Sequence, residues 1–219
     1  AENRDKTVML DASSRRNLEL DINLTGGVEN TLFDVLDTTA TTMASRLLRR
    51  WLNRPLQDLR TLEDRQNGIA EFQANFLHEN LREHLKNIGD MERILTRVAL
   101  RSARPRDLTR LFASLATLPE IASALKGCQL KHLNRLADDA KPLPHLVELL
   151  GSSLKENPPM VIRDGGVIAD GYDSELDELR ALNTNAGEFL LAMEEREKEA
   201  TGISTLKVGY NRVHGYYIE

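Results

Sequence analysis

The feature that most restricts how this chain can fold is a heptad pattern towards its C-terminal end. The residues of the pattern follow one another at alternating spacings of three and four positions: Leu176, Leu179, Asn183, Ala186, Leu190, Met193, Glu197 and Ala200. This spacing places them on one side of an α-helix and is typical of a helix that pairs with another along a seam. A helix over residues 173–200 is roughly 40 Å long at about 1.5 Å per residue. Nothing later in the sequence supplies the second helix, so we expect the chain to be part of a longer one.

The composition favours helices for the rest of the chain as well. Of the 219 residues, 41% are hydrophobic and only 5% are aromatic, so a core would be built on leucine and alanine. From Asn30 to about Gly151, apolar residues recur at helical spacing almost throughout. We expect Asp90 to cap one helix, Pro105 to begin the next and Pro119 to open another. The sequence therefore predicts a multi-helix core.

Short extended segments are expected on both sides of this helical stretch. Val8–Leu10 and Leu18–Leu20 are predicted as short strands or extended segments, joined by the polar Asp11–Asn17. Residues 160–162 and 167–169 flank a pair of glycines and predict a small hairpin or paired extended segments.

Two organisational parts follow from these patterns. We predict a helical core domain over residues 1–171, and a second part over 172–219 that holds the long helix and a small β tip. The predicted fold class is mainly α: a multi-helix core, a long helix that leads to a β-hairpin, and short extended segments near the N-terminus.

One helix of the predicted core carries the only tryptophan of the chain. Four apolar residues share one of its faces: Leu47, Leu48, Trp51 and Leu52. Four arginines cover the rest: Arg46, Arg49, Arg50 and Arg54. Because arginine-rich helical faces are usually solvated, we interpret the apolar face as a structural hub in the core and the arginines as a solvated surface.

The last residues of the chain predict a strand, a turn and a second strand. The segments 206–210 and 215–219 alternate in the manner of strands, and the turn between them is polar. The long helix is acidic, with nine acidic and three basic residues over 173–199, whereas the tip is basic. Four tip residues are candidates for contacts with phosphate oxygens: Lys207, Asn211, Arg212 and His214. An ordinary polar turn is the alternative interpretation.

Other kinds of chemistry find little support. Gly166 and Gly171 have the spacing of a phosphate-binding loop, but Tyr172 and Asp173 follow where Lys and Ser or Thr are required. No histidine lies in a cluster with metal-ligand spacing, and no catalytic residues are predicted. The single Cys128 excludes an internal disulfide and fits a reducing cytosol. There is no signal peptide or apolar run long enough to span a bilayer.

Two groups of segments resemble the MutS family of DNA mismatch-recognition proteins, in order and spacing and over most of the chain. The first group is similar to the core of that family: Asn17–Leu20, Gly27, Thr31–Leu32, Leu36–Asp37, Thr42–Leu52 and Pro55–Leu56. The second is similar to its lever and clamp: Arg163–Ala169, Gly171–Tyr172, Glu175–Asp177, Leu206–Asn211 and His214–Ile218. Thr42 and Ala44 depart from the family, which usually has Pro and Gly there, so a preset helix start and a close-packing glycine are lost.

The resemblance implies a part of a bacterial mismatch-repair protein that works as a clamp-like homodimer. The chain would be the core with the first half of the lever and clamp, coupling ATP state to clamp closure and contacting the DNA backbone without sequence preference. The family's Phe-x-Glu mismatch reader and its ATP-binding loop are not found in this sequence. ATP and Mg²⁺ would therefore belong to the parent protein and not to this chain, which is expected not to be an enzyme. Implied partners are mismatched double-stranded DNA and a downstream protein of the MutL type, in the cytoplasm and with no membrane.

Two alternatives from other classes remain open. A helical protein-interaction scaffold would use the seam of the long helix to bind a partner helix and would have no role on DNA. A free-standing enzyme would show turnover by these 219 residues alone. The net charge of −5 argues against a global nucleic-acid footprint, so any contact with DNA must be local.

Overall fold

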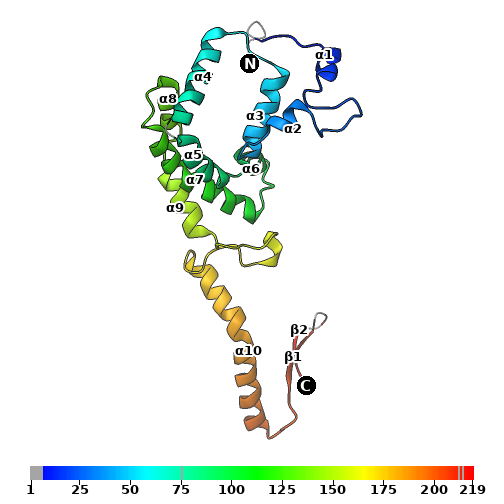
Figure 1. Cartoon of the computed structure of the whole chain (residues 1–219). Helices are drawn as coiled ribbons and strands as arrows, with labels where there is room; N and C mark the ends of the chain where they lie inside the picture. The colour runs from blue at the N-terminus through cyan, green and yellow to red at the C-terminus, as the bar shows by residue number, and fades with distance from the viewer. Residues whose placement is uncertain (1–6, 75, 212, 214) are drawn as a thin grey trace. The chain divides into compact units, whose positions relative to one another are not determined.

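The computed structural model describes residues 7–74, 76–211, 213 and 215–219. Its contacts divide the chain into two compact units, Ala1–Val167 (unit 1) and Ile168–Glu219 (unit 2). The described residues are mainly helical and end in a two-stranded hairpin (Figure 1). The predicted fold class is thereby confirmed.

Unit 1 is a succession of helices joined by loops, the longest of which lie between α1 and α2 and after α9. In chain order these are α1 (Ala12–Asn17), α2 (Leu32–Leu36), α3 (Thr42–Asn53), α4 (Leu59–Ala74), α5 (Leu77–Lys86), α6 (Met91–Ala99), α7 (Pro105–Leu125), α8 (Lys131–Asp139), α9 (Pro144–Ser153) and the 3-10 helix η2 (Ile162–Asp164). Several begin where the sequence predicted. The Asp90 carboxylate accepts from the backbone of α6, and Pro105 occupies the first turn of α7.

The core of unit 1 lies where α5, α7 and α8 meet (Figure 1). Its buried side chains are Leu81, Leu125, Cys128, Leu133 and Ala137. Phe72 of α4 and Ile121 of α7 pack against them from the rim. Burial, with the Glu71 carboxylate nearby, raises the pKa of the Cys128 thiol. The leucine- and alanine-based core expected from the composition is the one that forms.

The prediction that a helix begins at Pro119 is wrong. The helix runs from Pro105 to Leu125 without interruption and carries Pro119 inside. A proline there removes one backbone hydrogen bond. Leu115 on one side of it and Ala122 on the other are both buried. Packing along the whole length of α7 therefore outweighs the local preference of proline for a helix start.

The structure also corrects the predictions for the segments on both sides of the helical stretch. Residues 12–17, predicted as a polar connection, form α1, because the Asp11 carboxylate accepts from the Ser14 N–H at 2.8 Å and caps the helix. The only bridge described near the N-terminus joins Thr7 to Leu56. The hairpin predicted around residues 160–169 is replaced by η2, and the Val167 carbonyl accepts instead from the Lys155 N–H at 3.0 Å.

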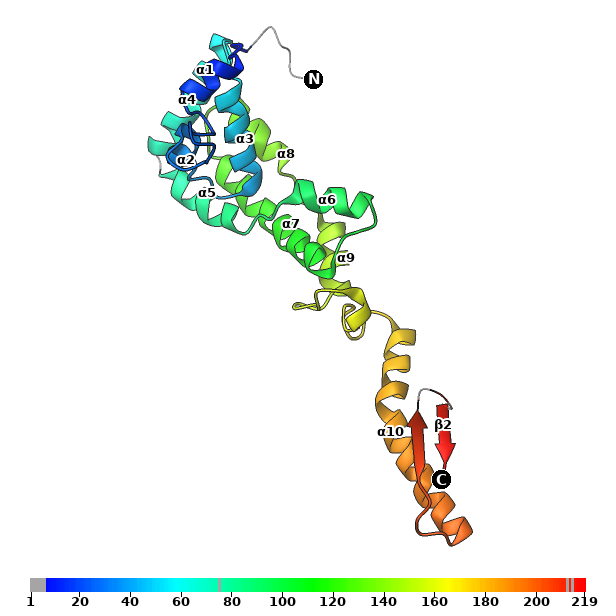
Figure 2. The same cartoon turned by 90° about the vertical axis from the view of Figure 1, so that its right-hand side faces the viewer.

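Unit 2 consists of α10 (Ser174–Thr201), β1 (Val208–Asn211) and β2 (Gly215–Ile218). Asp173 caps the start of α10, and Gly202 ends it in the left-handed conformation at φ 71°. The strands pair antiparallel, with Val208 opposite Ile218 and Tyr210 opposite Tyr216. After Gly202 the chain reverses, so that β1 runs back alongside α10 (Figures 1 and 2).

Among the described residues, no helix combines the length and apolar character that crossing a bilayer demands.

Candidate nucleic-acid interface

Two of the four predicted phosphate-contacting residues, Lys207 and Asn211, are described by the structure, and both lie in the hairpin of unit 2. Arg212 and His214 lie outside the residues that the structure describes. Asn211 is the last residue of β1. Lys207 is exposed and precedes β1, where its N–H donates to the Glu219 carbonyl at 2.8 Å and its carbonyl accepts from the Glu219 N–H at 2.9 Å. Lys207 therefore lies at the open end of the hairpin, on the order of 13 Å of strand away from the turn.

A carboxylate of α10 holds the hairpin on the helix. Oε2 of Glu194 accepts from the Val208 N–H of β1 at 3.0 Å, while Oε1 accepts from the Lys198 ammonium at 2.6 Å. The Glu194 side chain is largely covered, with 18% of its surface exposed. The ammonium of Lys198 and the Val208 N–H lower the pKa of Glu194, and the charge of Lys207 adds to the effect. The basic character of Lys207 is thus partly compensated by Glu194.

A second polar group orders the other end of α10. The Arg180 guanidinium bonds to the Asp170 carboxylate at 2.9 Å, to Asp177 at 3.2 Å and to the Ile168 carbonyl at 2.9 Å. The Gly171 N–H donates to Asp177 at 2.7 Å. The first turns of α10 are therefore tied to the segment that leads into the helix.

The hairpin carries aromatic rings on both faces. The rings of Tyr210 and Tyr216, a directly opposed pair, have centroids 5.1 Å apart and are both largely exposed. On the other face the Tyr217 ring lies across Gly209, where a Cβ atom would be 2.7 Å from the ring. Such cross-strand pairs stabilise a ladder that is otherwise only two strands wide. The hairpin is therefore a small platform with exposed hydroxyl and aromatic groups.

The predicted hub residues lie on α3, but they do not form a buried core. None of the residues of α3 is buried, and Trp51 keeps 39% of its surface exposed. Leu47, Leu48 and Leu52 are half-buried. The Arg65 guanidinium of α4 lies 3.6 Å from the centroid of the Trp51 ring, a cation–π contact.

The arginine face of α3 is also not simply solvated. Arg46 binds Asp90 at 2.7 and 2.8 Å and Glu92 at 2.6 Å, which joins α3 to the start of α6. The hydrogen bond from Arg46 holds the pKa of Asp90 well below its usual range. Arg49 lies over the Phe33 ring at 4.7 Å and 3.7 Å from Asp21. These arginines therefore fasten helices of unit 1 to one another.

The glycine loop before α10, which has the spacing of a phosphate-binding loop, does not fit a phosphate. The Asp173 carboxylate accepts from the Leu176 N–H at 2.9 Å, so the N-terminus of α10, where a phosphate would bind, is capped by a negative charge. Searched over the described residues, no group of three or more His, Cys, Asp or Glu side chains is arranged to hold a metal ion.

The sequence was compared with models of known protein families, and one of them matches most of the chain. The family model for MutS domain III matches residues 13–206, which takes in most of unit 1 and the α10 part of unit 2 and ends just before β1. The chain belongs to the MutS domain III family. Membership makes it part of a family of DNA mismatch-repair proteins, and MutS domain III is not the ATPase domain of those proteins. The family resemblance predicted from the sequence is confirmed.

Sequence reasoning missed the residues that hold the hairpin of unit 2 on α10. From the sequence, Glu194 is one of the nine acidic residues of the long helix, with nothing to single it out. Its spacing to Lys198, four residues on, is a signal for a helical ion pair that the sequence does contain. Its bond to Val208, 14 residues away, has no such signal because it depends on the reversal of the chain after Gly202.

Proposed function

We propose that this chain is the core, lever and clamp-bearing part of a DNA mismatch-recognition ATPase. In this proposal α10 is the outgoing lever helix, and the hairpin of unit 2 belongs to a clamp that contacts the DNA backbone. Unit 1 is the base to which the lever belongs. The proposal rests on membership of the MutS domain III family together with the contacts of unit 2.

The observation that carries the proposal is the fastening of the hairpin to α10 by Glu194. A clamp that transmits a conformational change must move as one piece with its lever, since a loosely attached hairpin would absorb the motion. Glu194 bonds at once to Lys198 within the helix and to the Val208 N–H of the strand. Arg180 ties the first turns of α10 to Asp170 in the same manner. These contacts support a lever and hairpin that respond together.

The acidic character of α10 suits a clamp that binds only through its hairpin. With nine acidic and three basic residues over 173–199, the helix repels a phosphate backbone. Lys207 and Arg212 would attract phosphates by charge, while Asn211 and His214 would donate hydrogen bonds. Contacts of this kind carry no base information. We therefore propose binding that does not depend on sequence and weakens steeply with salt.

The chemistry of ATP is assigned to another part of the parent protein. ATP and Mg²⁺ would bind there, and this chain would pass the resulting change to the clamp through rigid helices. We further propose that the parent works as a homodimer in the bacterial cytoplasm, on mismatched double-stranded DNA, with a downstream partner of the MutL type. Leu179, a residue of the seam, is exposed on α10, which supports the requirement for a further helix along the lever.

Fluorescence anisotropy of a labelled mismatched duplex, titrated with the chain at several salt concentrations, tests the DNA contact. The logarithm of the binding constant should fall with the logarithm of salt with a slope of about −2 if Lys207 and Arg212 each meet one phosphate. Replacing both by alanine should reduce the slope to near zero. Lys141→Ala, which removes an exposed lysine of unit 1, should leave the slope unchanged.

The same titration tests the competing function of a protein-interaction scaffold, which the exposed seam residue Leu179 also favours. A scaffold without a role on DNA predicts no binding at low salt, in this chain or in the longer parent protein. Binding that does not change when Lys207 and Arg212 are replaced would contradict the assignment of the hairpin.

A further inference from the structure

A surface of unit 1, between α1 and α2, carries several exposed apolar side chains. Leu18, Ile22, Leu24 and Val28 follow one another between α1 and α2, and each has more than half of its surface exposed. Leu20, in the same segment, is buried. A single exposed leucine is normal, but several on one segment indicate a surface that is covered by a partner.

The exposure does not arise from a loosely held loop. Oδ1 of Asn23 accepts from the Thr25 N–H at 3.1 Å and from the Gly27 N–H at 2.8 Å, and Nδ2 donates to the Glu29 carbonyl at 3.1 Å. The Leu24 N–H donates to Glu19 Oε1 at 2.7 Å. The loop is thus held by its own side chains while Ile22 and Leu24 point outwards. A preformed apolar surface binds with a smaller loss of conformational entropy than a flexible one.

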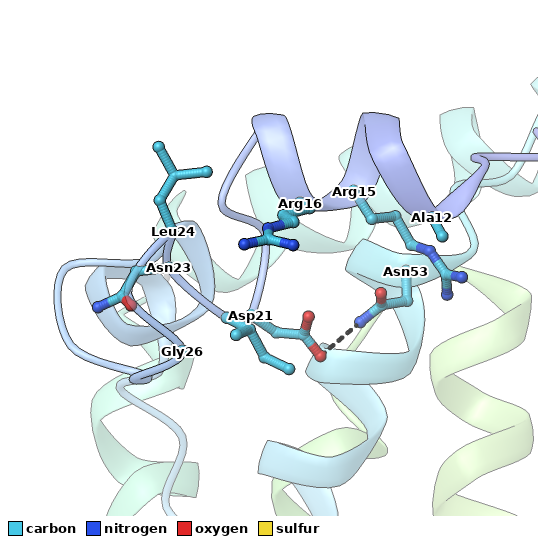
Figure 3. Close-up of a pocket in the computed structure, with 9 residues that line it drawn as sticks. Ala12, Arg15, Arg16, Asp21, Asn23, Leu24, Gly26 and Asn53 are labelled. Atoms are coloured by element: carbon cyan, nitrogen blue, oxygen red, sulfur yellow. Dashed lines mark hydrogen bonds between the residues drawn. The ribbon is translucent and has the colours of Figure 1, made fainter.

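Arg15 and Arg16 of α1 line the same pocket as Ile22 and Leu24. Figure 3 shows Arg16 projecting from α1 on the side of Asp21, Asn23 and Leu24, and Arg15 lying nearer to Ala12 and Asn53. Together with the end of α3 they line an open pocket of about 530 Å³. Asp21 is engaged by the Asn53 amide at 3.0 Å (Figure 3). Within the part of the chain that the structure describes, neither Arg15 nor Arg16 pairs with a carboxylate through its side chain.

We propose that Arg15, Arg16, Ile22 and Leu24, here called the α1 face, dock a polypeptide segment that carries carboxylates next to apolar side chains. Arginine pairs with carboxylates through two parallel hydrogen bonds, and the exposed Ile22 and Leu24 offer the partner's apolar side chains a dry contact. A nucleic acid fits this face less well. Its phosphates would meet the arginines, but the apolar residues would gain no cover from a charged backbone.

The test uses the whole chain and a fluorescein-labelled 16-residue peptide in which leucine alternates with glutamate. Fluorescence polarisation should show saturable binding that is lost when glutamine replaces the glutamates. The double variant Arg15→Glu/Arg16→Glu should bind the acidic peptide about tenfold or more weakly, as expected for two reversed charge pairs at an exposed surface. Ile22→Ser/Leu24→Ser should weaken binding while leaving the preference for glutamate intact. Arg163→Glu changes an arginine that is 89% exposed elsewhere in unit 1 and should have no effect.

Circular dichroism and thermal melting of each variant separate lost docking from lost folding, and since all four replaced side chains are exposed, each variant should melt like the parent. The proposal is overturned if the acidic peptide does not bind at millimolar concentration, or binds the arginine variant equally well. It is equally overturned if a labelled DNA duplex, and not the peptide, depends on Arg15 and Arg16. Sedimentation that shows these two arginines driving self-association of the chain would assign the face to a second copy and would also overturn it.

Discussion

Replacing Ser114 by alanine tests the packing of unit 1 at a single buried hydrogen bond. Ser114 of α7 has none of its surface exposed, and its Oγ accepts from the buried Gly89 N–H at 2.8 Å. The same hydroxyl donates to the Arg110 carbonyl at 2.7 Å. Gly89 precedes Asp90, the residue that caps α6 and holds Arg46. The bond therefore fixes the turn on which the connection between α3 and α6 depends.

The expected loss of stability follows from the backbone group that the substitution leaves without a hydrogen-bond partner. Ser114→Ala deprives the Gly89 N–H of its acceptor in a buried place, which costs about 1–3 kcal/mol. The Arg110 carbonyl loses less, because it can still accept from the backbone of α7. Taking about 2 kcal/mol, the Tm should fall by about 4–8 °C for a chain of this size.

Thermal melting followed by circular dichroism measures this, with Ser152→Ala as the matched control. Ser152 also donates to the carbonyl four residues earlier, that of Glu148 at 2.7 Å, but it is exposed on α9. Its replacement should change the Tm by less than 1–2 °C, within the small range usual for surface substitutions. Equal effects of the two variants, or no loss in Ser114→Ala, would refute the argument from the buried N–H of Gly89.

Three further predictions concern the contacts described above. Trp51→Ala should cost about 1–3 kcal/mol, less than for a fully buried tryptophan, because the ring is 39% exposed and packs under Arg65; urea unfolding measures it, and Trp51→Phe, which keeps a ring, should cost less. Asp90→Asn keeps a cap but loses the pairing with Arg46. The pKa of Asp90 is lowered in the folded chain, so its carboxylate stabilises the fold fully above about pH 4, and this stabilisation disappears as the pH falls through the lowered pKa. The difference in unfolding free energy between Asp90→Asn and the parent should therefore be largest above about pH 4 and should disappear in acid. A difference that persists in acid would contradict this. Glu194→Ala should speed hydrogen exchange of the Val208 amide severalfold, whereas Glu195→Ala, which changes the exposed neighbouring acid, should leave it unchanged.

The elements governed by local rules could be predicted from the sequence. The seam predicted a helix over residues 173–200, and α10 runs from Ser174 to Thr201 between its Asp173 cap and Gly202. The same holds for the start of α6 at Asp90. Caps, turn glycines and helical periodicity depend on residues within a few positions of one another, so one sequence is enough to recognise them.

The contacts that join these elements could not be predicted. Arg46 lies 44 residues from Asp90, and nothing in the arginine-rich face of α3 indicates which carboxylate will meet it. Pro119 signals a helix start locally, yet burial of α7 on both sides of it prevails. The candidate site shows the same division. The hairpin is visible in the alternating residues, but its attachment to α10 through Glu194 depends on the reversal of the chain in three dimensions.

The central claim, that the hairpin of unit 2 is the part that meets DNA, is tested most directly by amide chemical shifts of the isotope-labelled chain on addition of a mismatched duplex. The account predicts that shifts change mainly over residues 207–218, that the changes fade as salt is raised, and that α1 and its neighbouring loop are unaffected. Changes centred on unit 1, or no change at low salt, would contradict it.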